Sequence, residues 1–154
     1  MRDFNNTMDF VLLLSLLIIF TICFYNLCIK PKNRQDPLIR KIKYDVSKLD
    51  PRISSIEFFS SDESYTEDKK KIFLCIRDEK GKYYDYNMLI YVAIHECSHA
   101  LTDVIDLDHS TPEFKGMFEN LLTKAYRLGI YDPHKSLVTN YCGINIDQKE
   151  MQRL

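Results

Sequence analysis

The chain has 154 residues, which is enough for one modest domain with accessory segments. Hydrophobic residues make up 45% of it, with 10 Tyr and 9 Phe, and this composition excludes an intrinsically disordered chain. The formal net charge is −1, and residues 30–154 hold equal numbers of basic and acidic residues, so no nucleic-acid partner is expected.

An uncharged apolar run, FVLLLSLLIIFTICFYNLCI, occupies residues 10–29 and follows a short tail at residues 1–9. A helix of this length extends about 30 Å, the thickness of the hydrocarbon core, so the run predicts a transmembrane helix. A cleaved signal peptide is the alternative, but its apolar region is usually only about 7–15 residues long. Lys and Arg are sparse before the run and frequent after it, so the positive-inside rule predicts a single-pass membrane protein with a cytosolic C-terminal domain.

Residues 30–35 form a polar tether, and residues 36–154 carry the predicted folded domain. Asp36 and Pro37 suit the start of a short amphipathic helix, because Asp is a favourable N-cap and Pro is tolerated in the first turn. Apolar residues then recur at spacings of three and four, as one buried helix face requires. Two strands are expected next, at residues 53–60 and 71–77, joined by a polar loop.

Two longer helices complete the predicted domain. Residues 87–107 begin with an apolar stretch, MLIYVAI, that is typical of a helix buried in the centre of a domain. Residues 110–113, STPE, resemble a capping box for the next helix, and Gly129 suits its C-terminal end. The predicted fold class is α+β: an N-terminal transmembrane helix precedes a small domain in which one small sheet packs on two or three helices.

The cysteine spacing predicts neither a disulfide framework nor a thiolate zinc site. Cys23 and Cys28 lie in the apolar run, whereas Cys75, Cys97 and Cys142 are far apart, and no C-x-x-C pair is present. The odd number of thiols outside the run favours a reducing compartment.

Residues 95–99, HECSH, form an H-E-x-x-H motif within the predicted helix 87–107. Residues four apart share one helix face, with Cβ atoms about 5–6 Å apart, so His95 and His99 can bind one zinc ion. Glu96 lies beside the first ligand, as suits a base that acts on water. The alternative is a pair of helix histidines without a metal.

A catalytic zinc takes three protein ligands and keeps one position open for water. His109 is the preferred third ligand, because it lies ten residues after His99 and just before the next helix begins. A carboxylate is the alternative, and the aspartates nearby suit the orientation of a ligand imidazole as well. The acidic candidates are Asp103, Asp106, Asp108, Glu113 and Glu119.

His134 and Tyr141 are secondary candidates, as groups that stabilise the oxyanion of a transition state. His134 lies in a loop-like stretch that is typical of a surface histidine, and Tyr141 begins an apolar stretch that is typical of packing at the end of a domain. Cys97 is expected to be a small core residue.

The motif at residues 95–99, with His109 and the segment at residues 112–114 that opens the next helix, resembles the SprT-like and WLM group of small zincin-fold metallopeptidases. The resemblance covers roughly residues 84–146 and extends to small membrane-anchored metallopeptidase-like proteins of large DNA viruses. It implies a zincin-like domain with the motif on its central helix, a histidine third ligand at His109 and a catalytic base at Glu96. The longer spacing between His99 and His109 departs from WLM domains, and the neutral domain with its apolar run departs from members that act on chromatin.

The predicted function is therefore that of a membrane-anchored zinc metalloendopeptidase acting on a protein or peptide substrate, at a host or virion membrane. Zinc polarises the scissile carbonyl, and Glu96 moves a proton from water to the leaving amine. The alternative is a non-catalytic membrane-anchored protein, such as a virion component, in which a structural zinc is closed by a fourth ligand such as Asp106 or Glu113. A scaffold without any metal is the third interpretation.

Overall fold

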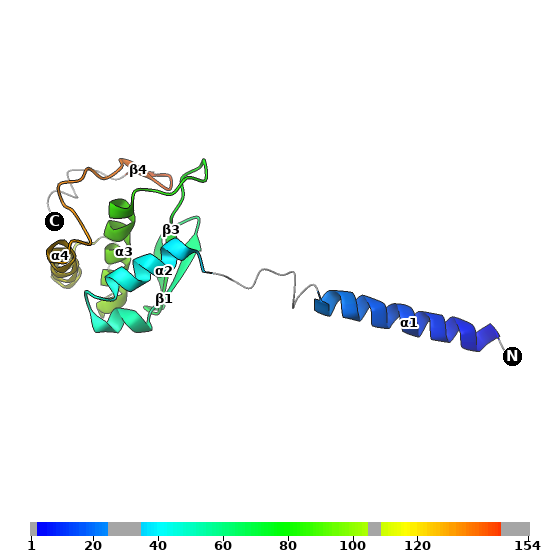
Figure 1. Cartoon of the computed structure of the whole chain (residues 1–154). Coiled ribbons are helices and arrows are strands. Elements are labelled where there is room, and N and C mark those ends of the chain that lie inside the picture. The colour runs from blue at the N-terminus through cyan, green and yellow to red at the C-terminus, as the bar shows by residue number, and fades with distance from the viewer. Residues whose placement is uncertain (1–2, 25–34, 105–108, 146–154) are drawn as a thin grey trace. The chain divides into compact units, whose positions relative to one another are not determined.

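The computed structural model describes residues 3–24, 35–104 and 109–145, in two units that divide after Arg34 (Figure 1). The first unit contains one helix, α1 (Asp3–Phe24), and the second unit contains the folded domain. Each unit is described by itself.

The predicted transmembrane helix is not borne out. Within the described residues, no helix combines the length and the apolar character that crossing a membrane requires. The first part of α1 includes the charged residues Asp3 and Asp9, so apolar residues occupy only part of this helix. The predictions of a transmembrane helix over residues 10–29 and of a single-pass protein with a cytosolic C-terminal domain are therefore wrong; residues 25–29 lie outside the described residues.

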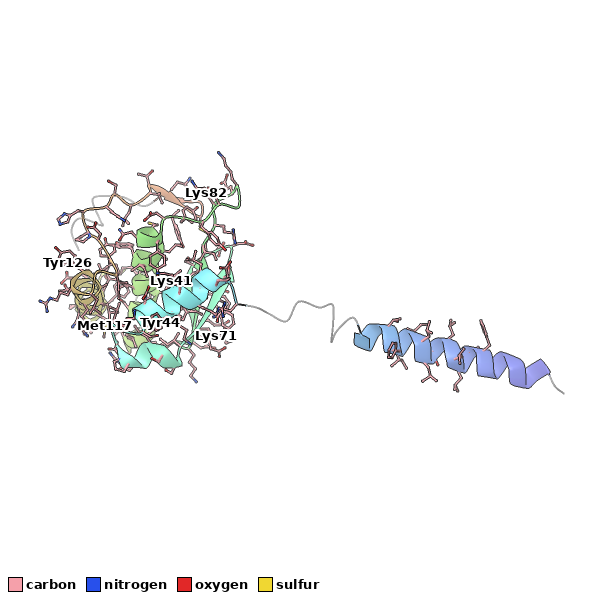
Figure 2. All side chains as sticks on the ribbon, viewed as in Figure 1. Lys41, Tyr44, Lys71, Lys82, Met117 and Tyr126 are labelled. Atoms are coloured by element: carbon pink, nitrogen blue, oxygen red, sulfur yellow. A yellow bond between two sulfur atoms is a disulfide. The ribbon has the colours of Figure 1, made fainter. Side chains whose placement is uncertain are left out.

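The domain begins with α2 (Pro37–Val46), as the sequence predicts. The Asp36 side chain accepts a hydrogen bond from the backbone N–H of Leu38, so it caps a helix whose first residue is Pro37. Lys41 and Tyr44 lie on the exposed face of this helix (Figure 2). The helix ends earlier than its apolar pattern suggests, and a short 3-10 helix, η2 (Pro51–Ser55), occupies the start of the predicted first strand.

The sheet has three strands in the order β1-β3-β2. β1 (Glu57–Ser61) pairs in parallel with β3 (Lys71–Cys75), and β2 (Tyr65–Glu67) pairs antiparallel with β3 as an outer strand. β2 was not predicted from the sequence, because a polar strand of three residues shows no apolar alternation. Phe58, Ile72 and Leu74 are fully buried on the face of the sheet that packs on the helices.

The two remaining helices are α3 (Tyr86–Leu101) and α4 (Pro112–Arg127). α3 contacts the sheet, α2 and α4, so it passes through the centre of the domain (Figure 1). Its apolar first half is buried accordingly, and Cys97 is fully buried as expected. α3 ends six residues before the predicted end, since Thr102 adopts an extended conformation, and α4 begins at an N-cap formed by Thr111.

The C-terminal part of the described chain forms a small hairpin of β4 (Asn140–Tyr141) and β5 (Ile144–Asn145). Cys142 in its turn forms a disulfide with Cys75 at the end of β3. The cysteine spacing did not predict this disulfide. The two residues are 67 positions apart in the chain, so their pairing depends on how the folded chain returns to the sheet. The α+β class is confirmed by this arrangement of sheet and helices.

Candidate metal centre

His95 and His99 lie one turn apart on α3, on the same face of the helix. Their Nε2 atoms are 3.3 Å apart. Two unprotonated side-chain nitrogens at this distance repel one another. Burial, together with the neighbouring His109 and His99, lowers the pKa of His95 to about 3. His95 is therefore neutral at physiological pH, which is the form that binds a metal ion.

His109 approaches the same point from the segment that precedes α4. Its Nε2 lies 3.1 Å from Nε2 of His99, and the three imidazoles place their ligand atoms within 4.8 Å of one another. The backbone of His109 has φ of 52°, in the left-handed region that residues other than glycine rarely adopt. Such strain is retained where it serves a site, and here it accompanies the turn of the chain back toward α3.

The spacing of the nitrogen atoms fits zinc. A tetrahedral zinc with Zn–N distances of about 2.0–2.1 Å requires ligand nitrogens about 3.3–3.4 Å apart. The separations of 3.3 Å for His95–His99 and 3.1 Å for His99–His109 agree with that requirement within the tolerance expected for metal sites. Among the described residues, this cluster consists of three histidines.

Phe114 and Phe118 on α4 fix the orientation of the imidazoles. The ring of Phe114 contacts all three histidines, with centroid distances of 5.1 Å to His95, 4.5 Å to His99 and 5.2 Å to His109. Phe118 adds a perpendicular contact with His95 at 5.5 Å. Both phenylalanines are buried, so these contacts restrict the imidazole rotamers before any metal binds. Neither residue was predicted as part of the site, although Phe114 belongs to the segment at residues 112–114 that carries the family resemblance.

Glu96 is almost completely buried, and its partner is Thr66 on β2. The Thr66 hydroxyl lies 2.8 Å from Oε2 of Glu96 and 2.9 Å from the Glu96 backbone oxygen, and its single proton goes to one of the two at a time. Burial raises the pKa of Glu96 to about 7, and the hydrogen bond from Thr66 partly opposes the shift. Thr66 was not predicted as a site residue, because Thr66 lies 30 residues before Glu96 in the chain, on the unpredicted strand β2.

Tyr141 is buried, and its hydroxyl lies at the end of the sheet. Its hydroxyl donates to the backbone oxygen of Cys75 at 2.5 Å and is 2.9 Å from Oγ of Ser64, which accepts the N–H of Cys75. Burial raises the pKa of Tyr141 to about 12. The hydroxyl is thus engaged with the end of the sheet.

His134 is exposed and lies against Tyr126, with ring centroids 6.5 Å apart. Tyr126 is near the far end of α4, about 18 Å along the helix axis from Phe114, so the structure separates His134 from the three-histidine cluster. The described acidic candidates also lie outside this cluster: Asp103, Glu113 and Glu119. Asp106 and Asp108 lie outside the described residues.

The chain is similar to three viral proteins. It is 45% identical over 93 residues to "Uncharacterized protein 136R" of Invertebrate iridescent virus 6, which covers 58% of this chain and 51% of the relative. It is 41% identical over 92 residues to "Uncharacterized protein 042R" of Invertebrate iridescent virus 3, with 59% and 56% covered. It is 37% identical over 89 residues to "Uncharacterized protein R325" of Acanthamoeba polyphaga mimivirus, with 55% and 44% covered.

The chain spans about half the length of these curated relatives. All three relatives are viral proteins, in agreement with the predicted similarity to proteins of viruses. No protein-family model matches the chain, and no solved structure matches it.

Proposed function

We propose that this chain is a zinc metallopeptidase whose metal ligands are His95, His99 and His109 and whose catalytic base is Glu96. The observation that carries the proposal is the convergence of three imidazoles whose ligand atoms lie within 4.8 Å of one another, with two of the Nε2 separations at the spacing of a tetrahedral zinc site. The buried carboxylate of Glu96 belongs to the residue that follows His95 on α3. The SprT-like and WLM resemblance of the same residues supports the assignment.

The residues of the site have different roles in the proposed reaction. When bound, zinc supplies a Lewis acid that makes water a nucleophile near neutral pH and polarises a carbonyl group. Glu96 follows His95 directly on α3, so its carboxylate accepts the proton of the attacking water and passes it to the leaving amine. Thr66 holds Oε2 of Glu96 by its hydroxyl, and Phe114 holds the imidazoles in place.

A peptide is the substrate class that best suits the surroundings of Glu96. In the three-stranded sheet, β2 is an outer strand, and the outer edge of a strand offers backbone N–H and C=O groups to an extended peptide. Thr66 belongs to β2 and contacts Glu96, so a peptide paired with this strand runs past the base.

The alternative function, a structural zinc site, requires a fourth protein ligand. In the part of the chain that the structure describes, the metal cluster contains three histidines, and Glu113 does not belong to it. The exclusion of Glu113 supports the catalytic function, and Asp106, the other candidate for a fourth ligand, lies outside the described residues.

The test uses the full chain, purified with zinc. We expect one zinc per chain by elemental analysis, with zinc retained in Glu96→Gln and weakened in His109→Ala. Casein digestion, followed by mass spectrometry of the fragments, is expected for the wild type and absent for Glu96→Gln. Equal digestion by Glu96→Gln would exclude the proposed base, and a folded chain without zinc would exclude the proposed metal site.

A further inference from the structure

The β2–β3 hairpin lies along the C-terminal half of α3 and contacts it at two points. Thr66 binds Glu96, and three residues later Lys69 donates hydrogen bonds from Nζ to the backbone oxygens of Thr102 and, at 3.4 Å, Val104. The two contacts lie six residues apart along α3 and its C-cap, about 9 Å along the helix axis. They bracket His99, the ligand that lies between Glu96 and Thr102 on α3.

The conformation of Lys69 is unfavourable for a residue with a side chain. Asp68 and Lys69 form a turn closed by a hydrogen bond from Lys70 N–H to the Glu67 backbone oxygen, with φ of 50° and 56°. A turn with two positive φ values favours glycine at its second central position, where this chain has Lys69. The strain accompanies a contact that only a long cationic side chain makes, at the negative end of the α3 dipole.

The contact falls where the chain leaves α3. Thr102 is the C-cap residue of α3, and its N–H and its hydroxyl both donate hydrogen bonds to the backbone oxygen of Ser98. Its extended backbone conformation turns the chain away from the helix. Val104 is five residues before His109, the ligand that returns to the helix. Lys69 thus holds both carbonyl groups at the start of the connection between the second and the third imidazole.

We propose that Lys69 is a positioning residue for the metal centre: its ammonium group fixes the exit of the chain from α3 so that His109 reaches His95 and His99. This role rests on the proposed zinc site. This role predicts that removing the Lys69 ammonium group weakens zinc binding. Electrostatics alone predicts the opposite change, since removing a cation near a bound divalent metal would tighten zinc binding.

The test compares zinc dissociation constants by competition with a chromophoric chelator, in the full chain. Lys69→Gly removes the ammonium group and relieves the backbone, and we expect zinc binding to weaken about tenfold, as for other residues that orient metal ligands. Asp68→Gly is the matched control, because it relieves the neighbouring residue of the same turn and keeps the ammonium group; its affinity should stay within about twofold of the wild type. Lys69→Arg keeps a cationic donor and should restore most of the affinity.

A double-mutant cycle with His109→Ala shows whether Lys69 acts through the third ligand. We expect Lys69→Gly to have no further effect on zinc affinity in the His109→Ala background. An equal loss in both backgrounds, or an affinity of Lys69→Gly equal to or tighter than that of the wild type, would overturn the role. A wild-type chain that binds no zinc would overturn the proposed function together with this inference, whereas zinc binding that is equal in wild type and Lys69→Gly would overturn the inference alone.

Discussion

Phe114 connects the packing of the domain to its metal chemistry. Its side chain is buried in the core, and its ring is in contact with each of the three imidazoles. A zinc site binds tightly when its ligands are held in place before the metal arrives, and a flat ring restricts imidazole rotation more than a branched aliphatic chain does.

We therefore expect Phe114→Leu to weaken zinc binding about tenfold, while the substitution keeps most of the buried volume and the chain stays folded. Phe118→Leu is the matched control, because Phe118 is equally buried but contacts His95 alone among the three histidines. Zinc affinity by chelator competition and folding by circular dichroism are the measurements. If the two variants bind zinc equally, contact with all three imidazoles has no special role.

The left-handed residues show how local strain is distributed. Among the described residues, the non-glycine residues with positive φ are Asp68, Lys69, His109 and Cys142. His109 supplies a candidate ligand, Lys69 binds the end of α3, and Cys142 forms the disulfide. Three of these four strained positions thus carry a specific contact, which explains why glycine does not occupy them.

At the scale of elements, α2 is fastened to α3 through one carboxylate. Asp45 accepts hydrogen bonds from Tyr86 at 2.6 Å and from Lys48 and Lys41 at 2.7 and 2.9 Å. Burial acts to raise the pKa of Asp45, but these hydrogen bonds outweigh it and lower the pKa to about 2.

The shift predicts a pH dependence of stability. A carboxylate whose pKa is lower in the folded state stabilises the fold above its unfolded pKa of about 3.9, and this contribution is lost as the pH falls toward the folded value. We expect Asp45→Asn to lower the free energy of unfolding by about 1 kcal/mol at pH 7, a value reduced for the solvent exposure of both lysines.

Urea denaturation of the two chains from about pH 7 to about pH 2 measures this difference, which should shrink below about pH 4. Asp62→Asn, at an exposed carboxylate, is the control and should leave the stability nearly unchanged. A difference for Asp45→Asn that is constant over the whole range would contradict the prediction.

At the scale of the whole folded unit, the C-terminal hairpin is joined to the sheet by covalent and polar contacts. The disulfide of Cys142 with Cys75 lies beside the hydrogen bonds that the Tyr141 hydroxyl makes with the Cys75 backbone oxygen and Ser64. Cys142 N–H also donates to the Tyr84 hydroxyl. The loop that the disulfide closes spans most of the domain, including α3 and α4.

Closing such a long loop should stabilise the domain by about 2–4 kcal/mol. We therefore expect dithiothreitol to lower the Tm of the full chain and Cys142→Ser to lower it by a similar amount. The Tm of Cys142→Ser should not respond to dithiothreitol, because this variant already lacks the disulfide between Cys75 and Cys142. Thermal unfolding followed by circular dichroism checks both, and equal Tm values of the oxidised and reduced wild type would refute the stabilisation.

The sequence predicted those parts of the fold that depend on neighbouring residues. The start of α2 follows from Asp36 and Pro37, the buried course of α3 follows from its apolar first half, and the shared face of His95 and His99 follows from helix periodicity. The membrane-spanning prediction is wrong, because no helix among the described residues combines the length and the apolar character that a membrane span requires.

The sequence by itself determined the H-E-x-x-H pair, the candidate third ligand and the α+β class, since spacing within a helix and alternation within a strand are local properties. Only the tertiary structure decided which distant residues serve the site: Thr66 at Glu96, Phe114 against the imidazoles, and Lys69 at the end of α3. It also decided the pairing of Cys75 with Cys142. These contacts arise because sheet pairing and helix packing bring together residues far apart in the chain, and no local pattern of residues encodes where such segments meet.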